Sequence, residues 1–593
     1  MRIQMKRICG LVWLAVVLAL CTTASSSHSA APATGDFHDD LSPWGMVGSP
    51  GVPLLPETGN RWVRAFGDWE RVQPTQGQWN WAETDKVVAD ARANHINVLG
   101  YWWYFAPWAS ADGGTRRGPI KDMQFFKDYV TGTVSRYHGN VKYWEVWNEF
   151  NGSFYEGGSG NRARDYADLV VAAYDAAKQV DPTVKVGMSV ASSDIGFLDL
   201  AIKAGAANHF DFICIHPYEN LDAMTYSGDE AGFLTLGNTL RLMLAQNKQP
   251  ISTPLWITEV GHPAPVKPDP QADALQASII VKSYILPLAQ GFQRIFWFCF
   301  PSWGDDTGDY GLVRPDKSTR PSYIAYKTMI SLLGMEPKYE GWVNLGKDGH
   351  GFLFRGQSED VLAAWALPGK EESTAFKTDV RVTDLTGKES NLTAGMGLAL
   401  TGTPVFLRGL PASLVEQGNS NRNKPFPWDR NYAHARNATL SIRPGETNDE
   451  HGLRRIFLGK EQEGLTEPAT VNGESCLRVV SKDHDNNFAY FRADPSYIPF
   501  GRTALDITVK VRRLTQDQAA GIAITYETLE GYKDFQKGFE PWTIPAGDAW
   551  QEHTWHVNDA SFADKWGWHL GLVSTGTGDQ FLIKEVSITK SHR

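Results

Sequence analysis

The sequence predicts a multidomain protein: a (β/α)8 TIM barrel, then a small β-sandwich, then a C-terminal β-rich domain of jelly-roll type. Between about residues 41 and 335, eight short apolar runs alternate with helix-like stretches. After Met335 the texture changes to short strand-like runs with frequent turns, and a second β-rich block follows a polar segment. The length of 593 residues accommodates two to four domains of ordinary size.

The eight apolar runs are mostly β-branched or aromatic and nearly continuous, which is typical of strands buried on both faces. They are PWGMVG, RWVRAF, INVLGYW, VKYWEVW, VKVGMSV, FDFICIH, PLWITEV and RIFWFCF. Amphipathic helix candidates separate several of them, at 81–94, 122–137, 164–180 and 272–290. This alternation favours a barrel. A doubly wound open sheet is the alternative, but GMVGSPG is a poor match to a phosphate-binding loop.

The predicted domain limits follow the changes in composition. The barrel is placed at 36–335, the small sandwich at 336–415 and the jelly-roll-like domain at 431–593. Between the last two, residues 416–430 (EQGNSNRNKPFPWDR) are polar with two prolines and read as a linker. The last domain resembles a carbohydrate-binding module, although a fold does not establish binding.

Residues 1–30 are predicted to be a secretory signal. Arg2, Lys6 and Arg7 precede the apolar run LVWLAVVLAL, which is too short to span a bilayer as a mature helix. No later run of 18 apolar residues follows, so no transmembrane segment is expected. The expected location is secreted or periplasmic, with the cleavage site open.

Composition excludes several kinds of partner. The chain has 57 Lys and Arg against 67 Asp and Glu, a net charge of −10, which argues against nucleic acid. Beyond the signal, Cys214, Cys299 and Cys476 are too few for a disulfide framework and read as buried thiols. The acidic segments 305–309 and 483–487 are more typical of turns than of cation sites. We therefore predict no metal and no cofactor; the oligomeric state stays open.

Tryptophan is abundant, with 22 residues in the chain. Large cores explain this abundance, and so do flat faces on which sugar rings stack. Candidates for such faces in the barrel end strand three (Trp102, Trp103, Tyr104 and Trp108) or follow strand eight (Trp303 and Tyr310). In the last domain they are Trp542, Trp550, Trp555, Trp566 and Trp568.

Two glutamates close predicted barrel strands. Asn148-Glu149 follows the fourth strand in YWEVWNEFNG, and Glu259 ends the seventh in LWITEVG. Catalytic residues of barrels lie at the carboxyl ends of strands, and a carboxylate at the tip of an apolar strand needs a partner or a function. Two such carboxylates on one face are the pair that glycoside hydrolysis uses. The alternative for each one is helix capping or an ion pair with an arginine.

Trp-Asn-Glu closing strand four, with a glutamate closing strand seven, resembles clan A of the glycoside hydrolases. The resemblance covers residues 41–335 and implies that Glu149 is the acid/base and Glu259 the nucleophile. With the small sandwich included, the chain looks most like enzymes of families 39 and 30, and also of family 5. Phe150 follows Glu149 where many relatives have proline, so the resemblance holds for the clan rather than for one family.

The resemblance also implies roles for five further residues. Asn148 would contact the sugar 2-hydroxyl, and Arg64 would lie near the nucleophile. His216 and Tyr218, in a His-Pro-Tyr sequence, would contact the nucleophile and the substrate, and Trp297 would floor the sugar subsite. Structural roles are the alternative: an ion pair for Arg64, and core packing for His216 and Trp297.

The function expected from the sequence is a secreted retaining glycoside hydrolase. It would act by double displacement on O-glycosidic bonds, expected to be β-linked, in a polysaccharide or oligosaccharide. A non-catalytic carbohydrate-binding protein and a transglycosylase on the same scaffold are the alternatives. The sugar, the linkage and endo or exo action stay open, because loops decide them.

Overall fold

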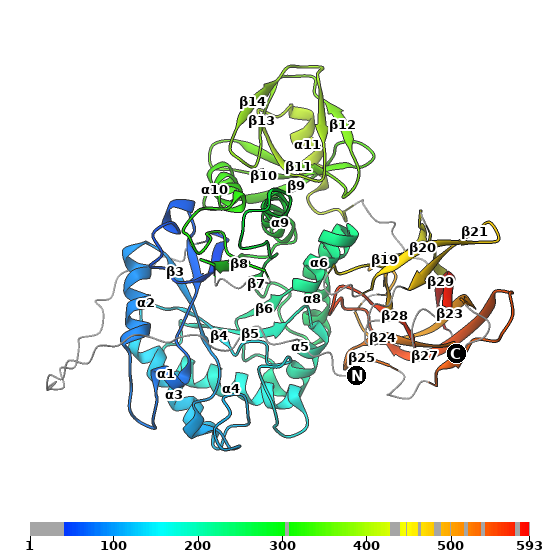
Figure 1. Ribbon diagram of the computed structural model, residues 1–593. Coiled ribbons are helices and arrows are strands. Elements are labelled where there is room, and N and C mark those ends of the chain that lie inside the picture. The colour runs from blue at the N-terminus through cyan, green and yellow to red at the C-terminus, as the bar shows by residue number, and fades with distance from the viewer. Residues whose placement is uncertain are drawn as a thin grey trace. The chain divides into compact units, whose positions relative to one another are not determined.

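The computed structural model describes residues 41–302, 308–426, 439–445, 447–459, 464–479, 488–498, 500–514, 520–534, 540–575 and 581–591 (Figure 1). The predicted signal, Trp303, residues 305–307, the end of the predicted linker (427–430) and segment 483–487 lie outside these ranges. Within them, no helix combines the length and apolar character needed to cross a membrane.

The eight predicted barrel strands all form, and they close into a parallel barrel in the order β1 to β8. Their bounds are β1 Trp44–Gly48, β2 Trp62–Arg64, β3 Asn97–Trp102, β4 Tyr143–Val146, β5 Lys185–Ala191, β6 Phe212–His216, β7 Leu255–Val260 and β8 Arg294–Phe300. The doubly wound alternative is thereby excluded.

Helices connect these strands, and the four predicted ones form within two residues of their expected ends. The α-helices are α1 Trp69–Val72, α2 Ala82–Ala93, α3 Met123–Arg136, α4 Arg162–Val180, α5 Ile195–Ala201, α6 Tyr218–Ser227, α7 Glu230–Phe233, α8 Leu236–Gln246, α9 Pro270–Ala289 and α10 Pro321–Leu333. Short turns of other helix types are η1 Pro56–Thr58, η2 Pro107–Ala109 and η3 Ile202–Ala206. Asp122, Asn161 and Asp269 start α3, α4 and α9 by accepting backbone N–H groups of the first turn.

The inside of the barrel changes from aromatic to polar along the strands. Near the start of their strands, Trp62, Tyr143 and Trp256 surround the guanidinium of Arg294, at 4.4, 5.2 and 4.6 Å from the ring centroids. Side chains two positions further on point to the same side of a strand. Those positions hold Arg64, Glu145 and Thr258, and the same step on β6 leads from Cys214 to His216. Polar groups are thus gathered at the carboxyl end of the barrel.

The small sandwich has a six-stranded sheet in the order β14-β13-β16-β11-β10-β9 and a two-stranded sheet of β12 and β15. The bounds are β9 Lys338–Asn344, β10 Gly349–Arg355, β11 Asp360–Ala366, β12 Glu372–Ala375, β13 Val380–Thr383, β14 Glu389–Leu392, β15 Gly397–Leu400 and β16 Val405–Arg408.

The predicted linker differs from the structure at its beginning. Helix α11 (Ala412–Asn421) runs through its first six positions. Leu414 and Val415 pack against the core of the sandwich, and the Asn421 amide donates to the carbonyl of Trp342 at 3.2 Å. Tertiary contacts therefore order a segment whose polar composition indicates a loop.

The C-terminal domain is antiparallel, with its strands paired in the order β18-β17-β29-β23-β27-β24-β28-β22-β19. The bounds are β17 Thr439–Arg443, β18 Asp449–His451, β19 Leu453–Ile456, β20 Thr466–Val471, β21 Glu474–Val479, β22 Phe488–Ala493, β23 Thr503–Arg513, β24 Gly521–Thr528, β25 Gly531–Lys533, β26 Trp542–Thr543, β27 Gln551–Ala560, β28 Leu570–Ser574 and β29 Phe581–Lys590. Cys214, Cys299 and Cys476 are buried free thiols, as predicted.

Candidate active site

Glu149 and Glu259 come together at the carboxyl end of the barrel. Glu149 lies in the turn after β4, and Glu259 is the penultimate residue of β7. One carboxylate oxygen of each lies within 4.8 Å of the other and of a ring nitrogen of His216. Both side chains are open to solvent, by 17% and 12% of their surface. A retaining mechanism needs this short separation, roughly 5–5.5 Å between carboxyl groups.

The turn that carries Glu149 has an uncommon backbone. Trp147 and Glu149 have φ of 66° and 51°, in the left-handed region that non-glycine residues rarely adopt. Such a conformation costs on the order of 1–3 kcal/mol and persists only where the surroundings impose it. Two backbone hydrogen bonds of 2.8 Å do so, from Trp147 to the carbonyl of Trp102 and from Gly152 to that of Glu149.

Arg64 on β2 joins three acceptors. Its guanidinium donates to Glu259 at 2.5 Å, to Glu145 at 2.6 Å and to the amide oxygen of Asn148 at 2.8 Å. Burial disfavours its charge, but Glu145 and Glu259 outweigh burial and raise the pKa of Arg64 above its ordinary value. A permanent cation therefore holds Glu259 and orients Asn148.

His216 connects Glu149 to the interior of the barrel. Its Nδ1 lies 2.9 Å from Glu149, and its Nε2 lies 3.0 Å from the Thr258 hydroxyl, which donates to Glu145 at 3.0 Å. Burial lowers the pKa of His216, but the charge of Glu259 and the hydrogen bonds with Glu145 and Glu149 together raise it to about 9. Near neutral pH the ring is an imidazolium that donates toward Glu149.

Tyr218, the first residue of α6, donates its hydroxyl to the second oxygen of Glu259 at 3.1 Å. Burial, followed by the charge of Glu259, keeps the pKa of Tyr218 well above its ordinary value, so the hydroxyl stays a donor. One oxygen of Glu259 thus accepts from Arg64 and the other from Tyr218. Both contacts stabilise the ionised carboxylate.

Glu145 is a member of this cluster that the sequence interpretation missed. It is fully buried on β4, and it accepts from Arg64 and Thr258. Burial raises its pKa, but Arg64 and His216 outweigh burial and lower the pKa to about 2. Its sequence signal is a carboxylate within an apolar strand, the same signal that identified Glu259.

Glu149, His216 and Glu259 also have the residue types and spacing of a metal site. The donor set does not fit a cation, however. Arg64 and Tyr218 occupy the two oxygens of Glu259, and a protonated imidazole offers no lone pair to a metal.

Trp297 is not brought to the site, contrary to the role expected for it. It is fully buried in the core cluster shared with the helices, and its indole N–H donates to the carbonyl of Tyr310 at 2.9 Å. The next residue, Phe298, is half-buried and packs near the rings of Tyr218 and Tyr310, with centroids 6.4 and 5.7 Å away. After Arg294 the run RIFWFCF is wholly apolar, so its composition does not reveal which of these residues point inward. The aromatic residue near Tyr218 is Phe298, one position after the expected Trp297.

The aromatic residues after β3 divide between core and surface. Trp102 is fully buried and stacks on Trp144 at 4.8 Å, so it belongs to the core. Trp103 and Tyr104 are half-buried and stack on each other at 4.2 Å.

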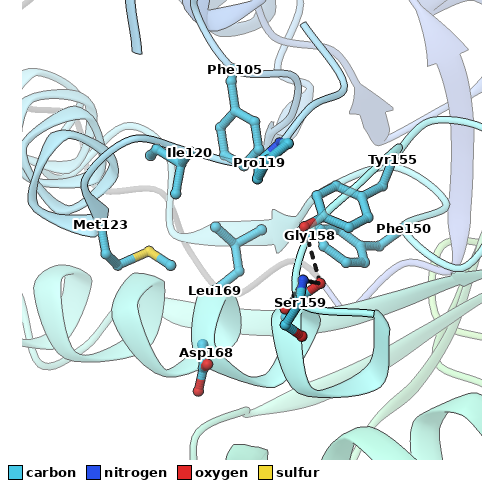
Figure 2. A pocket seen from close by; sticks show the side chains of 11 residues that line it. Phe105, Pro119, Ile120, Met123, Phe150, Tyr155, Gly158, Ser159, Asp168 and Leu169 are labelled. Atoms are coloured by element: carbon cyan, nitrogen blue, oxygen red, sulfur yellow. Dashed lines mark hydrogen bonds between the residues drawn. The ribbon is translucent and has the colours of Figure 1, made fainter. Parts of the chain in front are cut away.

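A pocket of about 230 Å³ is lined in part by Phe150 and Tyr155, which follow β4 in the chain (Figure 2). Its wall is mostly apolar, and Phe105, Ile120, Phe150 and Leu169 contribute to it. Phe150 stacks on Tyr155 with centroids 3.9 Å apart. The lining includes neither Glu149 nor Glu259, so this pocket is separate from the carboxylate pair.

A closed barrel of eight parallel strands, with glutamates closing β4 and β7, defines the class: the barrel is of the kind found in clan A glycoside hydrolases, as the resemblance predicted. Within this class, the model of glycosyl hydrolase family 10 matches residues 67–188, a stretch that includes Asn148 and Glu149.

Relatives match over a limited part of the chain. Endo-1,4-beta-xylanase C of Paenibacillus barcinonensis is 30% identical over 140 residues, which are 20% of this chain and 13% of that protein. Endo-1,4-beta-xylanase 3 of Hypocrea jecorina is 27% identical over 125 residues, which are 20% of this chain and 34% of that protein. The chain therefore covers well under half of either relative.

A solved structure matches over a longer stretch. It is a family 39 glycoside hydrolase from Bacteroides cellulosilyticus WH2, with a TM-score of 0.52 and 22% identity over 63% of this chain and 82% of that one. At this level of identity, the similarity establishes a shared fold.

Proposed function

We propose that the protein is a retaining glycoside hydrolase in which Glu149 is the acid/base and Glu259 the nucleophile. The observation that carries the proposal is the pair itself, two solvent-open carboxylates with oxygens within 4.8 Å at the carboxyl end of the barrel. A non-catalytic carbohydrate-binding protein would not require this pair or the cations that surround it.

The charges around the pair support these roles. Arg64 and His216 supply two positive charges against the carboxyl groups of Glu145, Glu149 and Glu259. The cluster is neutral when one carboxyl carries a proton. Because Arg64 pairs with both Glu145 and Glu259, we assign the role of proton donor to Glu149. Glu259 then attacks as a carboxylate while Glu149 protonates the leaving oxygen.

The second step uses the same residues in reverse. Glu149, now ionised and facing the imidazolium of His216, takes a proton from the water that hydrolyses the glycosyl–enzyme. The amide oxygen of Asn148 is occupied by Arg64, which leaves its NH₂ group to donate to the sugar 2-hydroxyl. Phe298 and Tyr218 form the aromatic wall, and Trp297 supports it from the core.

The substrate class is a β-linked polysaccharide or oligosaccharide. Because the matching relatives carry the name endo-1,4-beta-xylanase, β-1,4-xylan is the first substrate to test. The protein acts outside the cytoplasm, as the apolar run near its start predicts. The C-terminal domain, which resembles a carbohydrate-binding module, binds glycan.

Proton NMR of the first sugar released from xylan or from aryl β-glycosides tests the mechanism. We expect the β-anomer first, and an α-anomer as the initial product would refute retention. Glu259→Ala should lower hydrolysis by several orders of magnitude, whereas Glu83→Ala, which changes a surface glutamate on α2, should not. Products at high acceptor concentration separate a hydrolase from a transglycosylase.

A further inference from the structure

The C-terminal domain contacts the barrel beside the candidate acid/base. Segment 561–569, between β27 and β28, meets the loop that follows β5 and the first turn of α6. The carbonyl of Lys565 accepts from the Ser193 backbone at 3.3 Å, and that of Asp564 accepts from the Asn220 amide at 3.0 Å. A Cβ added to Gly567 would lie 2.7 Å from the Glu219 carbonyl, so the backbones touch here.

This contact has the buried apolar packing and the buried hydrogen bonds that are typical of a domain interior. Leu529 and Ala563 belong to the same buried apolar cluster as the helices of the barrel. The fully buried carboxylate of Glu527 accepts the backbone N–H groups of Ala563, Asp564 and Lys565 at 2.9, 3.1 and 2.9 Å. These bonds fix the conformation of the segment that presents Lys565 to the barrel.

Lys565 is connected to the turn of Glu149 through two further side chains, Asp194 and Asn151. The Lys565 ammonium lies 2.6 Å from Asp194, and the Asn151 amide donates to the same oxygen of Asp194 at 2.8 Å. Asn151 follows Glu149 by two residues, and its amide oxygen accepts from the Ala191 backbone at 2.7 Å. The lysine of one domain thus fastens the turn that holds the candidate acid/base in another.

The loop after β5, which contains Asp194, also contacts His216, the histidine beside Glu149. The backbone N–H of His216 donates to the Ser192 carbonyl at 3.1 Å, and Ser192 has a φ of 56°. Segment 191–194 therefore lies between the two supports of Glu149, Asn151 on one side and His216 on the other. Asp194 is buried; one of its oxygens accepts the N–H of Phe197 at the start of α5 at 3.1 Å, and the ammonium of Lys565 supplies the counter-charge to the other.

We propose that Lys565 is a positioning residue for the acid/base, acting on Glu149 through Asp194 and Asn151. The C-terminal domain then supports catalysis directly, besides any glycan binding of its own. This inference rests on the proposed function. It predicts that the domain affects the hydrolysis of small soluble substrates, which a tethered carbohydrate-binding module would leave unchanged.

Lys565→Met in the full chain tests the proposal through the dependence on the leaving group. The value of kcat/KM reports the step in which Glu149 protonates the leaving oxygen. For an unactivated β-xylo-oligosaccharide we expect a loss of about 10²-fold, as for a misplacement of about 1 Å. For a dinitrophenyl β-xyloside, whose leaving group needs no proton, we expect little loss. Lys565→Arg should restore most of the activity, because it keeps the charge.

The matched control is Lys533→Met. It removes a half-buried lysine that pairs with Asp559 within the same domain, at 2.9 Å. Equal losses on both substrates would indicate general damage and overturn the proposal, as would wild-type values on both. If the wild-type protein hydrolyses no glycoside at all, the proposed function fails. Amide hydrogen exchange of residues 148–154 then decides: faster exchange in Lys565→Met than in Lys533→Met supports the positioning role, and equal exchange overturns it.

Discussion

Two fully buried glutamates, Glu145 and Glu230, have similar surroundings at two different places. In each case burial raises the pKa, but a neighbouring cation and a histidine outweigh burial and lower it to about 2. Glu145 lies inside the barrel beneath the candidate pair. Glu230 begins α7 and lies where α9 meets strands β10 and β11 of the small sandwich.

The partners of Glu230 come from both domains. Lys282 of α9 lies 2.7 Å from one oxygen, His350 of β10 lies 3.0 Å from the other, and the indole of Trp365 on β11 donates to both. All four residues are buried. This cluster joins the sandwich to the barrel.

The two clusters differ in the other carboxylates that their cations contact. Arg64 and His216 extend from Glu145 to Glu259 and Glu149, two carboxylates that solvent can reach. The side chains that contact Glu230 are all buried between the barrel and the small sandwich. A buried charge with a lowered pKa is therefore not in itself a sign of catalysis. The candidate site differs in that its cations also contact two carboxylates that are open to solvent and lie within 4.8 Å of each other.

The largest expected effect separates the two clusters by activity. Glu145→Gln removes the charge that balances Arg64 and His216, and we expect a loss of about 10²-fold in kcat because the pair shifts. Glu230→Gln, which makes the same change in the other cluster, should leave kcat of the folded protein unchanged. Hydrolysis rates on one aryl β-glycoside provide the measurement. Equal losses in the two variants would show that the cluster around Glu145 supports activity no more than the cluster around Glu230 does.

The features that a periodic or local sequence pattern encodes were predictable from the sequence. Eight apolar runs were sufficient to predict the barrel, and glutamates at two strand ends were sufficient to predict that Glu149 and Glu259 lie on one face of it. The inward phase of β8 was difficult to predict, because every residue of RIFWFCF after Arg294 is apolar. Glu230 and Lys565 act through partners more than 50 residues away, on other elements, and no local pattern reveals such partners.

A second effect concerns the stability of the cluster around Glu230. Breaking a buried ion pair costs about 3–5 kcal/mol because a charge is left unpaired, so Glu230→Gln should lower the free energy of unfolding by that amount. Replacing Glu230 and Lys282 together by methionine should recover only part of the loss: it removes the unpaired charge, but the buried His350 and Trp365 lose their acceptor. Urea unfolding measures both variants. A double variant as unstable as the single one would mean that the pair does more than cancel its own burial cost.

The smallest expected effect is the dependence of stability on pH, which has a different sign for the two kinds of group. The pKa of His216 is raised from 6.5 to about 9, so its contribution is complete below pH 6.5 and is lost as pH rises through 9. This shift corresponds to about 3 kcal/mol. The pKa values of Glu145 and Glu230 fall from 4.5 to about 2, so their contributions are complete above pH 4.5 and are lost as pH falls toward 2.

Melting temperatures should therefore be highest between about pH 4.5 and 6.5. His216→Gln should flatten the alkaline decline and leave most of the acid one, because it removes the group whose pKa is raised to about 9. Glu230→Gln should do the reverse, weakening the acid decline and keeping the alkaline one. If Glu230→Gln also flattened the alkaline side, the two clusters would be coupled through the barrel, and Glu230 would have to be counted among the supports of the candidate site.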